Sequence, residues 1–164
     1  MRKTLYSHLL LLALLCGICC ACGSDDNTPE GPTPEKLEPQ ERPTDWVAVT
    51  VGIDLQSSMT ADVGIDLTPL GYQYETDSLD LAAAFIDGTC RAVSAPHIDP
   101  ETGKTVFALT IKKLASEETG KDVWLKFYSA KLHHIFTSKS AIKYEGERRY
   151  GSAEEPYKPE WNIK

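Results

Sequence analysis

Four cysteines near the N-terminus have types and spacing that could support chemistry. Cys16, Cys19, Cys20 and Cys22 include the Cys-x-x-Cys spacing of zinc sites, and two aspartates follow at positions 25 and 26. A structural zinc site needs a folded shell of other residues around it. These cysteines instead lie in or beside an apolar segment that has the pattern of a targeting leader. We therefore assign no metal site to them.

The first 21 residues have the pattern of a signal peptide. Arg2 and Lys3 supply a positive start, and residues 9–18 form an apolar run that is followed by small residues. A stable membrane-spanning helix needs about 20 apolar residues. The run is shorter than this, so it is expected to be a leader that is cut away.

The end of this leader, Ala21-Cys22-Gly23, resembles the lipobox of bacterial lipoproteins. In that family the cysteine becomes the first mature residue and carries the lipid, so the resemblance predicts acylation of Cys22 and a membrane anchor. The usual Leu three residues before the acylated cysteine is Cys19 here, a compact residue that an apolar pocket could accept. Cys20 is the alternative attachment site.

The next residues, Gly23, Ser24, Asp25 and Asp26, resemble the acidic export signal of surface lipoproteins of the Bacteroidota. The resemblance implies an outer-membrane protein that faces the cell exterior. Any solvated linker could have the same residues, which leaves a periplasmic location open. Residues 22–45 are rich in proline and acids, and they are expected to form a disordered, extended tether.

The acidic composition argues against a nucleic-acid partner. The formal net charge is −7, and it becomes −9 once Arg2 and Lys3 leave with the leader. Phosphate backbones require clustered Lys and Arg side chains. No cofactor is implied, and the expected partners are the membrane, through the lipid, with glycan or envelope proteins as candidates outside it.

Apolar and polar residues begin to alternate at Trp46, where the folded part is expected to start. Residues 46–55 place one apolar set on a single face, and residues 59–67 repeat the pattern. A period of two predicts a half-buried strand in each segment. The inward residues of the first strand would be Val47, Val49, Val51, Ile53 and Leu55.

A tight turn is predicted at Asp87-Gly88, since this pair between two apolar runs is a strong hairpin signal. It favours paired strands at 79–86 and 89–95, although the alanines of 79–86 would also suit a short helix. The fold class predicted is all-β: an antiparallel β-sandwich of seven or eight strands, immunoglobulin-like or jelly-roll-like, as one domain over 46–150. A tail follows over 151–164. The later strands are expected at 105–111, 123–128, 132–137 and 141–144.

Several segments together resemble a β-sandwich domain of surface and secreted Bacteroidota proteins. They are Ser58-Met59-Thr60, DSLDLAAAFIDGTCRAV at 77–93, FALTI at 107–111 and VWLKFYSAK at 123–131. The resemblance covers residues 57–137 and implies an extracellular accessory or binding module. It implies neither a catalytic site nor a particular ligand. Members of that family often carry Gly where this chain has Ala92.

No catalytic constellation with adequate spacing is present, so we predict a protein that is not an enzyme. Cys90 is expected to be a buried apolar residue. His133 and His134 are neighbours on a predicted strand, where their side chains would point to opposite faces and could not chelate one ion together. Calcium remains a minor alternative if loops bring together Asp54, Asp62, Asp66, Asp77 and Asp80.

Aromatic residues give the one positive indication of a ligand. Flat rings beside polar groups suit the recognition of sugars or peptides. We therefore expect a lipid-anchored surface module that binds glycan or another extracellular polymer, with a structural subunit of an envelope complex as the alternative. For the tail itself, we favour the expectation that its aromatic rings dock on the sandwich. The candidate ligand-binding residues are Trp124, Tyr144, Tyr150 and Trp161.

Overall fold

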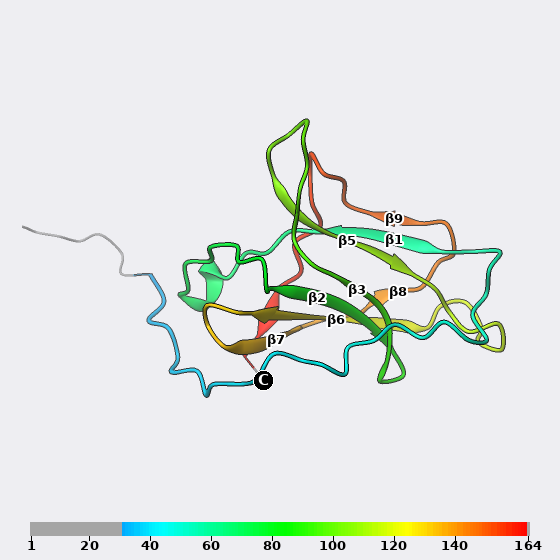
Figure 1. The fold of residues 1–164 in the computed structure, drawn as a ribbon, viewed down its shortest axis with the longest axis horizontal. Coiled ribbons are helices and arrows are strands. Elements are labelled where there is room, and N and C mark those ends of the chain that lie inside the picture. The colour runs from blue at the N-terminus through cyan, green and yellow to red at the C-terminus, as the bar shows by residue number, and fades with distance from the viewer. Residues whose placement is uncertain (1–30, 164) are drawn as a thin grey trace, which may run out of the picture. The chain divides into compact units, whose positions relative to one another are not determined.

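Two β-sheets pack face to face in the computed structural model of this chain, which describes residues 31–163 (Figure 1). One short 3-10 helix, η1 (Thr68–Leu70), follows the first strand. The strands are β1 (Met59–Val63), β2 (Leu81–Ile86), β3 (Thr89–Ser94), β4 (His97–Ile98), β5 (Thr105–Ile111), β6 (Asp122–Ser129), β7 (His134–Ser138), β8 (Ile142–Lys143), β9 (Arg149–Tyr150) and β10 (Trp161–Asn162).

The smaller sheet has the order β4-β5-β1-β9, and the larger has the order β10-β7-β6-β2-β3 with β8 beside the start of β6. All neighbours are antiparallel except β1 and β9. The predicted β-sandwich is confirmed, and a strand lies within or across each segment expected from residue 59 onward, although the first of them ends at Val63 and not at residue 67. The described residues hold ten strands because β4, β9 and β10 are two-residue strands, too short to produce a periodic pattern.

Large aromatic rings fill the space between the sheets. Phe107 of β5, Phe127 of β6 and Phe136 of β7 are buried together, and the ring centroids of Phe107 and Phe127 are 5.6 Å apart. A second apolar cluster lies on the outer face of the larger sheet, where the rings of Trp46 and Phe85 pack in a T-shaped arrangement with their centroids 5.7 Å apart. The larger sheet is therefore covered on both faces.

The hairpin between β2 and β3 forms at the predicted turn. Asp87 and Gly88 both have positive φ, 48° and 77°, as a two-residue hairpin turn of type I′ requires. All six residues of β2 are buried. The segment is thus a strand and not a short helix, and its apolar character on both sides matches the two clusters that cover it.

The strand predicted for residues 46–55 is wrong. Trp46 is buried, but Val51 is 85% exposed and Val47 and Leu55 also face solvent. Only two contacts of strand type form: the N–H of Val49 donates to Cys90 O at 3.1 Å, and Ile53 makes an isolated bridge. The alternating pattern satisfies one requirement of a strand, but a strand also needs a hydrogen-bonded partner along its length.

Residues 35–46, named here the N-terminal strap, lie against the larger sheet. The N–H of Gln40 donates to His133 O at 2.6 Å, and the side-chain oxygen of Gln40 accepts the N–H of Ile135 at 2.7 Å. Leu37 packs against the core. This part of the chain differs from the disordered tether predicted for 22–45, because Leu37 and Trp46 find apolar contacts; residues 22–30 lie outside the described residues.

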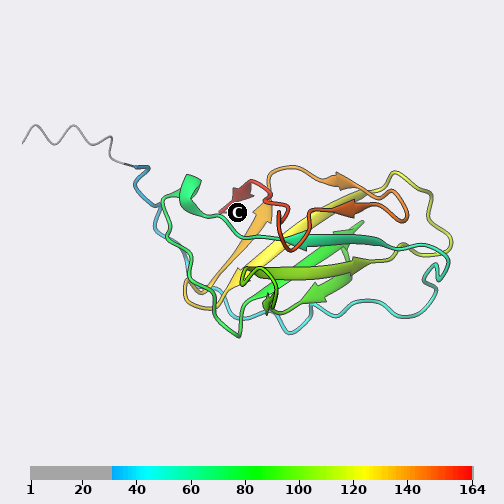
Figure 2. The ribbon, with the colours of Figure 1, turned by 90° about the horizontal axis from the view of Figure 1, so that it is seen from above.

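The tail over 151–163 is docked in two places. Tyr157 bridges to Val63 at the end of β1, and β10 pairs with β7 through Trp161 and Ser138. The C-terminal segment, drawn in orange and red, runs beside β1 and then reaches the edge of the larger sheet in Figure 2. The tail therefore connects the two sheets at one end of the sandwich.

Candidate functional site

The four aromatic candidates do not form one surface. Tyr144 is completely buried in the core, and Tyr150 is half-buried with its ring centroid 5.8 Å from that of Tyr157. Trp124 is 40% exposed on β6, where it alternates with core residues and so faces outward. Trp161 packs on the opposite, inner face of the same sheet. Tyr144 is thus excluded as a direct ligand contact, because packing between the sheets has covered it.

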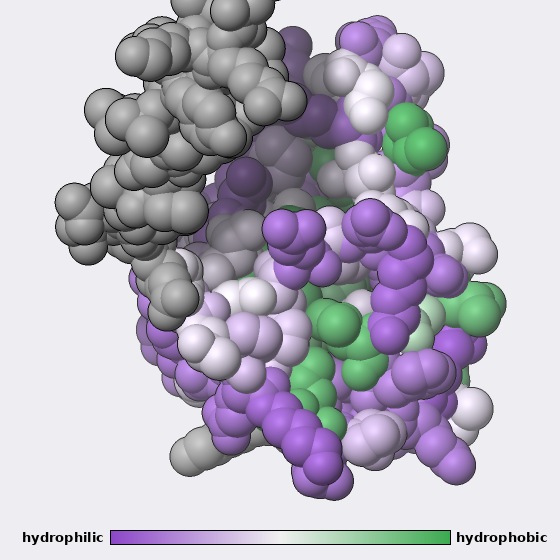
Figure 3. Space-filling model, turned by 90° about the vertical axis from the view of Figure 1, so that its left-hand side faces the viewer, coloured by the Kyte–Doolittle hydropathy of each residue, from purple (hydrophilic) through white to green (hydrophobic). Residues whose placement is uncertain are grey.

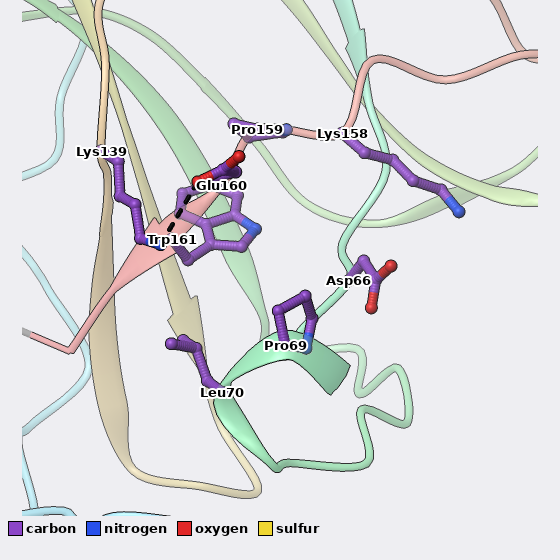
Figure 4. A pocket seen from close by; sticks show the side chains of 8 residues that line it. All are labelled: Asp66, Pro69, Leu70, Lys139, Lys158, Pro159, Glu160 and Trp161. Carbon is purple, nitrogen blue, oxygen red and sulfur yellow. Dashed lines mark hydrogen bonds and ion pairs between the residues drawn. The ribbon is translucent and has the colours of Figure 1, made fainter. Parts of the chain in front are cut away.

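A pocket of about 300 Å³ lies beside Trp161 (Figure 4). Its apolar wall comes from η1 and from the tail, with Pro69 and Leu70 on one side and Pro159 and Trp161 on the other. Figure 3 looks onto this end of the sandwich and shows hydrophobic residues among strongly hydrophilic ones. Ligand pockets have volumes of about 300–1,000 Å³. The pocket is thus large enough for a small ligand.

The wall formed by η1 is positioned by Asp66. Its Oδ1 atom accepts the backbone N–H of Thr68 at 3.0 Å and the hydroxyl of the same residue at 2.6 Å. These hydrogen bonds lower the pKa of Asp66 below its usual value. Gly71 ends the helix with a φ of 83°, and its N–H donates to Thr68 O at 3.0 Å.

The opposite wall is positioned by the tail. The N–H of Lys139 donates to Glu160 O at 2.8 Å, and this bond continues the pairing of β10 with β7. Trp161 is 2% exposed, and its ring centroid lies 6.0 Å from that of Phe127. The indole is therefore fixed by the core of the sandwich, so its edge has one orientation toward the pocket.

The indole Nε1–H of Trp161 is buried and has no acceptor among residues 31–163. Figure 4 shows this nitrogen on the side of the ring where Asp66 and Lys158 lie. A buried donor without an acceptor costs about 1–3 kcal/mol, so native proteins rarely leave one. The pocket thus contains a hydrogen-bond donor that a ligand oxygen could satisfy.

Charged side chains of both signs surround the pocket. Lys139 pairs with Glu160 at 3.2 Å, and both side chains are largely exposed. Lys158 and Asp66 also line the pocket, and the lysine contributes to the lowered pKa of Asp66. Two ammonium groups thus face two carboxylates, and the pocket has no net charge.

The five aspartates considered for calcium do not come together. Asp54 pairs with Lys113 at 3.3 Å and Asp62 with Arg149 at 2.6 Å. Asp80 is buried and accepts hydrogen bonds from the Tyr74 hydroxyl and from the N–H groups of Asp77 and Ala130. Across the described part of the chain, no three His, Cys, Asp or Glu side chains form a group suited to a metal ion.

Cys90, His133 and His134 occupy positions that suit a structural role. Cys90 is buried, as expected, and burial raises the pKa of its thiol. His134 is buried while His133 is exposed in the turn before β7, with a φ of 48°. One ring is therefore packed and the other faces solvent, although His133 lies before β7 and not on the strand that the sequence predicted for it.

Sequence reasoning selected Trp161 but missed the residues that surround it. Leu70, Lys139, Lys158 and Pro159 lie in three separate segments, and no local motif connects them. The lipidation and export candidates, Cys22, Ser24, Asp25 and Asp26, lie outside the described residues.

No family model, no curated protein and no solved structure matches this chain. Residues 31–163 include no helix with the length and apolar character needed to span a bilayer.

Proposed function

We propose that this protein is a lipid-anchored module of the bacterial cell surface that binds an extracellular polymer and performs no catalysis. The lipobox-like Ala21-Cys22-Gly23 and the acidic residues after it support the anchor and the outward location. The observation that carries the binding role is the buried, unpartnered indole N–H of Trp161 beside a pocket. Docking of the tail accounts for the burial of its aromatic rings. It does not account for an N–H donor that is held beside a cavity without an acceptor, and this donor favours a ligand.

The anchor is tested by labelling cells with radioactive palmitate. The wild-type protein is expected to carry the label and to sediment with membranes, while Cys22→Ala loses both properties. A single acyl chain binds membranes only marginally, whereas two or more give a stable anchor. A label that persists in Cys22→Ala but disappears in Cys20→Ala would move the attachment site by two residues.

The outward location is tested by protease treatment of intact cells. We expect digestion of the wild-type protein and protection of a variant in which Asp25 and Asp26 are both replaced by Ala. Equal protection of both proteins would contradict surface exposure and favour the periplasm.

Binding itself is tested with a glycan array, on which the solubilised full chain should give a signal that Trp161→Phe reduces.

A second candidate function, a structural subunit of an envelope complex, is favoured by one observation. Val47, Val51 and Leu55 are exposed and recur at strand spacing without a paired strand in the described part of the chain. Such a segment could supply an added strand to a partner. A photo-crosslinker at Val51 should then give one defined protein adduct in cells, and the same crosslinker at exposed Glu118 should not.

A further inference from the structure

We propose that the pocket between η1 and β10 holds one neutral sugar residue of an extracellular glycan. This inference depends on the proposed function, because it names the class of ligand for the same site. Three features carry it: the free hydrogen-bonding groups, the balance of charge and the apolar walls.

Two donors and one acceptor at the pocket are not used within the described residues. The first donor is the indole N–H of Trp161. Lys158 forms no ion pair within the described part of the chain, and its ammonium group is the second donor. The two bonds from Thr68 both end on Oδ1 of Asp66, so Oδ2 remains as an acceptor.

A hydroxyl group matches this combination because it accepts and donates at once. Its oxygen can accept from the indole N–H or from Lys158, while its hydrogen is donated to Asp66 Oδ2. A hydrocarbon ligand would offer a hydrogen-bond partner to none of the three groups, and the buried indole N–H would stay unsatisfied. Adjacent hydroxyls on one ring would supply several such groups from a single small ligand.

The balance of charge favours a neutral ligand. Lys139 and Lys158 oppose Asp66 and Glu160 around one small pocket. An anionic ligand would be attracted by the lysines and repelled by the carboxylates, and a cationic ligand would meet the reverse arrangement. Neither an anionic nor a cationic ligand gains a clear electrostatic advantage, so the pattern of hydrogen-bond donors and acceptors determines which ligand binds.

The apolar walls and the volume suit one ring. Pro69, Leu70 and Pro159 present carbon surfaces that can pack against the C–H groups of a sugar. A volume of about 300 Å³ is at the lower limit of ligand pockets. The pocket is therefore suited to a single terminal sugar rather than to a length of chain.

Indole resonances in proton–nitrogen NMR spectra of the solubilised full chain provide a direct test. The chain has three tryptophans, and Trp161→Phe assigns the signal of interest while Trp124→Phe assigns the control. The neutral probes are glucose, galactose, mannose and N-acetylglucosamine, and the charged probes are glucuronate and glucosamine. We expect at least one neutral sugar to move the Trp161 signal saturably and to leave the Trp124 signal unchanged.

Variants of the free groups test the proposed contacts. Asp66→Asn and Lys158→Met are each expected to weaken that sugar's affinity about fivefold, as for loss of one hydrogen bond. Asp66→Asn retains an oxygen that can accept from Thr68, so η1 should persist. Glu155→Gln, an exposed change outside the pocket, should leave the affinity unchanged.

The outcomes separate this inference from the proposed function. The inference is overturned if no neutral sugar moves the Trp161 signal, or if glucuronate or glucosamine binds more tightly than every neutral probe. A glycan array signal that is equal for wild type and Trp161→Phe would overturn the pocket as the site and leave the proposed function standing. An array without any signal for the wild type would overturn both.

Discussion

Arg91 on β3 and Glu117 in the loop before β6 form a buried ion pair, with Nη2 of the arginine 2.5 Å from Oε1 of the glutamate. The two side chains are 2% and 12% exposed. The other carboxylate oxygen accepts the N–H of Leu114 at 2.7 Å, and Nζ of Lys113 donates to Glu117 O at 2.8 Å. The pair therefore fixes the β5–β6 loop against the edge of the larger sheet.

Glu117→Gln is expected to lower the free energy of unfolding by about 3–5 kcal/mol, because it leaves a buried guanidinium without an opposite charge. Urea denaturation of the purified protein measures this change. Adding Arg91→Met to the same variant should restore much of the loss, since neither charge then remains. The exposed pair Lys143–Asp122 is the control, and Asp122→Asn should change stability little. Equal effects at both pairs would contradict a buried pair.

Gly151→Ala is expected to destabilise the protein strongly and to loosen the tail. Gly151 has a φ of 71°, and an added Cβ would lie 2.3 Å from the backbone nitrogen of Tyr157 and 2.8 Å from Asp62 O. Those two atoms form the 2.8 Å hydrogen bond that attaches the tail to β1. Hydrogen exchange at the Tyr157 amide and urea denaturation provide the measurements.

Gly103→Ala is the matched control for this change. Gly103 also has a positive φ, 68°, but nothing lies within 4 Å of an added Cβ. Gly103→Ala should therefore lower the free energy of unfolding by only about 1–2 kcal/mol, the cost of a positive φ for alanine. If the two alanine variants lose the same stability, the close approach at Gly151 is not what holds the tail.

His134→Phe is expected to release the N-terminal strap. The ring nitrogens of His134 lie 3.0 Å from Glu38 O and 2.8 Å from Ile163 O, so one buried side chain joins both ends of the described chain. Phenylalanine keeps an aromatic ring there but has no ring N–H to donate to either carbonyl oxygen. Trypsin should then cleave after Lys36 faster than in the wild type, while cleavage after Lys104, beside a distant turn, keeps its rate.

The stability of the wild-type protein is expected to fall as the pH rises above about 8.5, in part through Cys90. Burial raises the pKa of this thiol in the folded protein, and the Sγ–H group donates to Ala92 O at 3.5 Å. The unfolded chain therefore loses the proton at a lower pH, and thiolate formation favours unfolding in the window between the two pKa values. Urea denaturation between about pH 7 and about pH 10 should show a smaller decline for Cys90→Ala. An identical decline would exclude this thiol as a contributor.

Local patterns were sufficient where a segment's structure depends on its own residues. The Asp87-Gly88 turn forms because both positions tolerate positive φ, and the segments 107–111 of β5 and 123–127 of β6 bury alternate side chains as their sequences indicate. The same logic failed for residues 46–55. Their alternation is as regular as that of β1, but no strand edge pairs with them along their length.

The sequence by itself determined the all-β class, the hairpin and the alternating faces of the main strands, because hydrophobic periodicity and turn chemistry act over a few residues. Only the tertiary structure decided that Tyr144 is core, that the strap is bound and that Trp161 lines a pocket with Leu70 and Lys158. Burial and hydrogen-bond pairing depend on which faces and edges remain free once distant segments have packed. The pocket joins three such segments, so it exists only when the tail has closed one end of the sandwich.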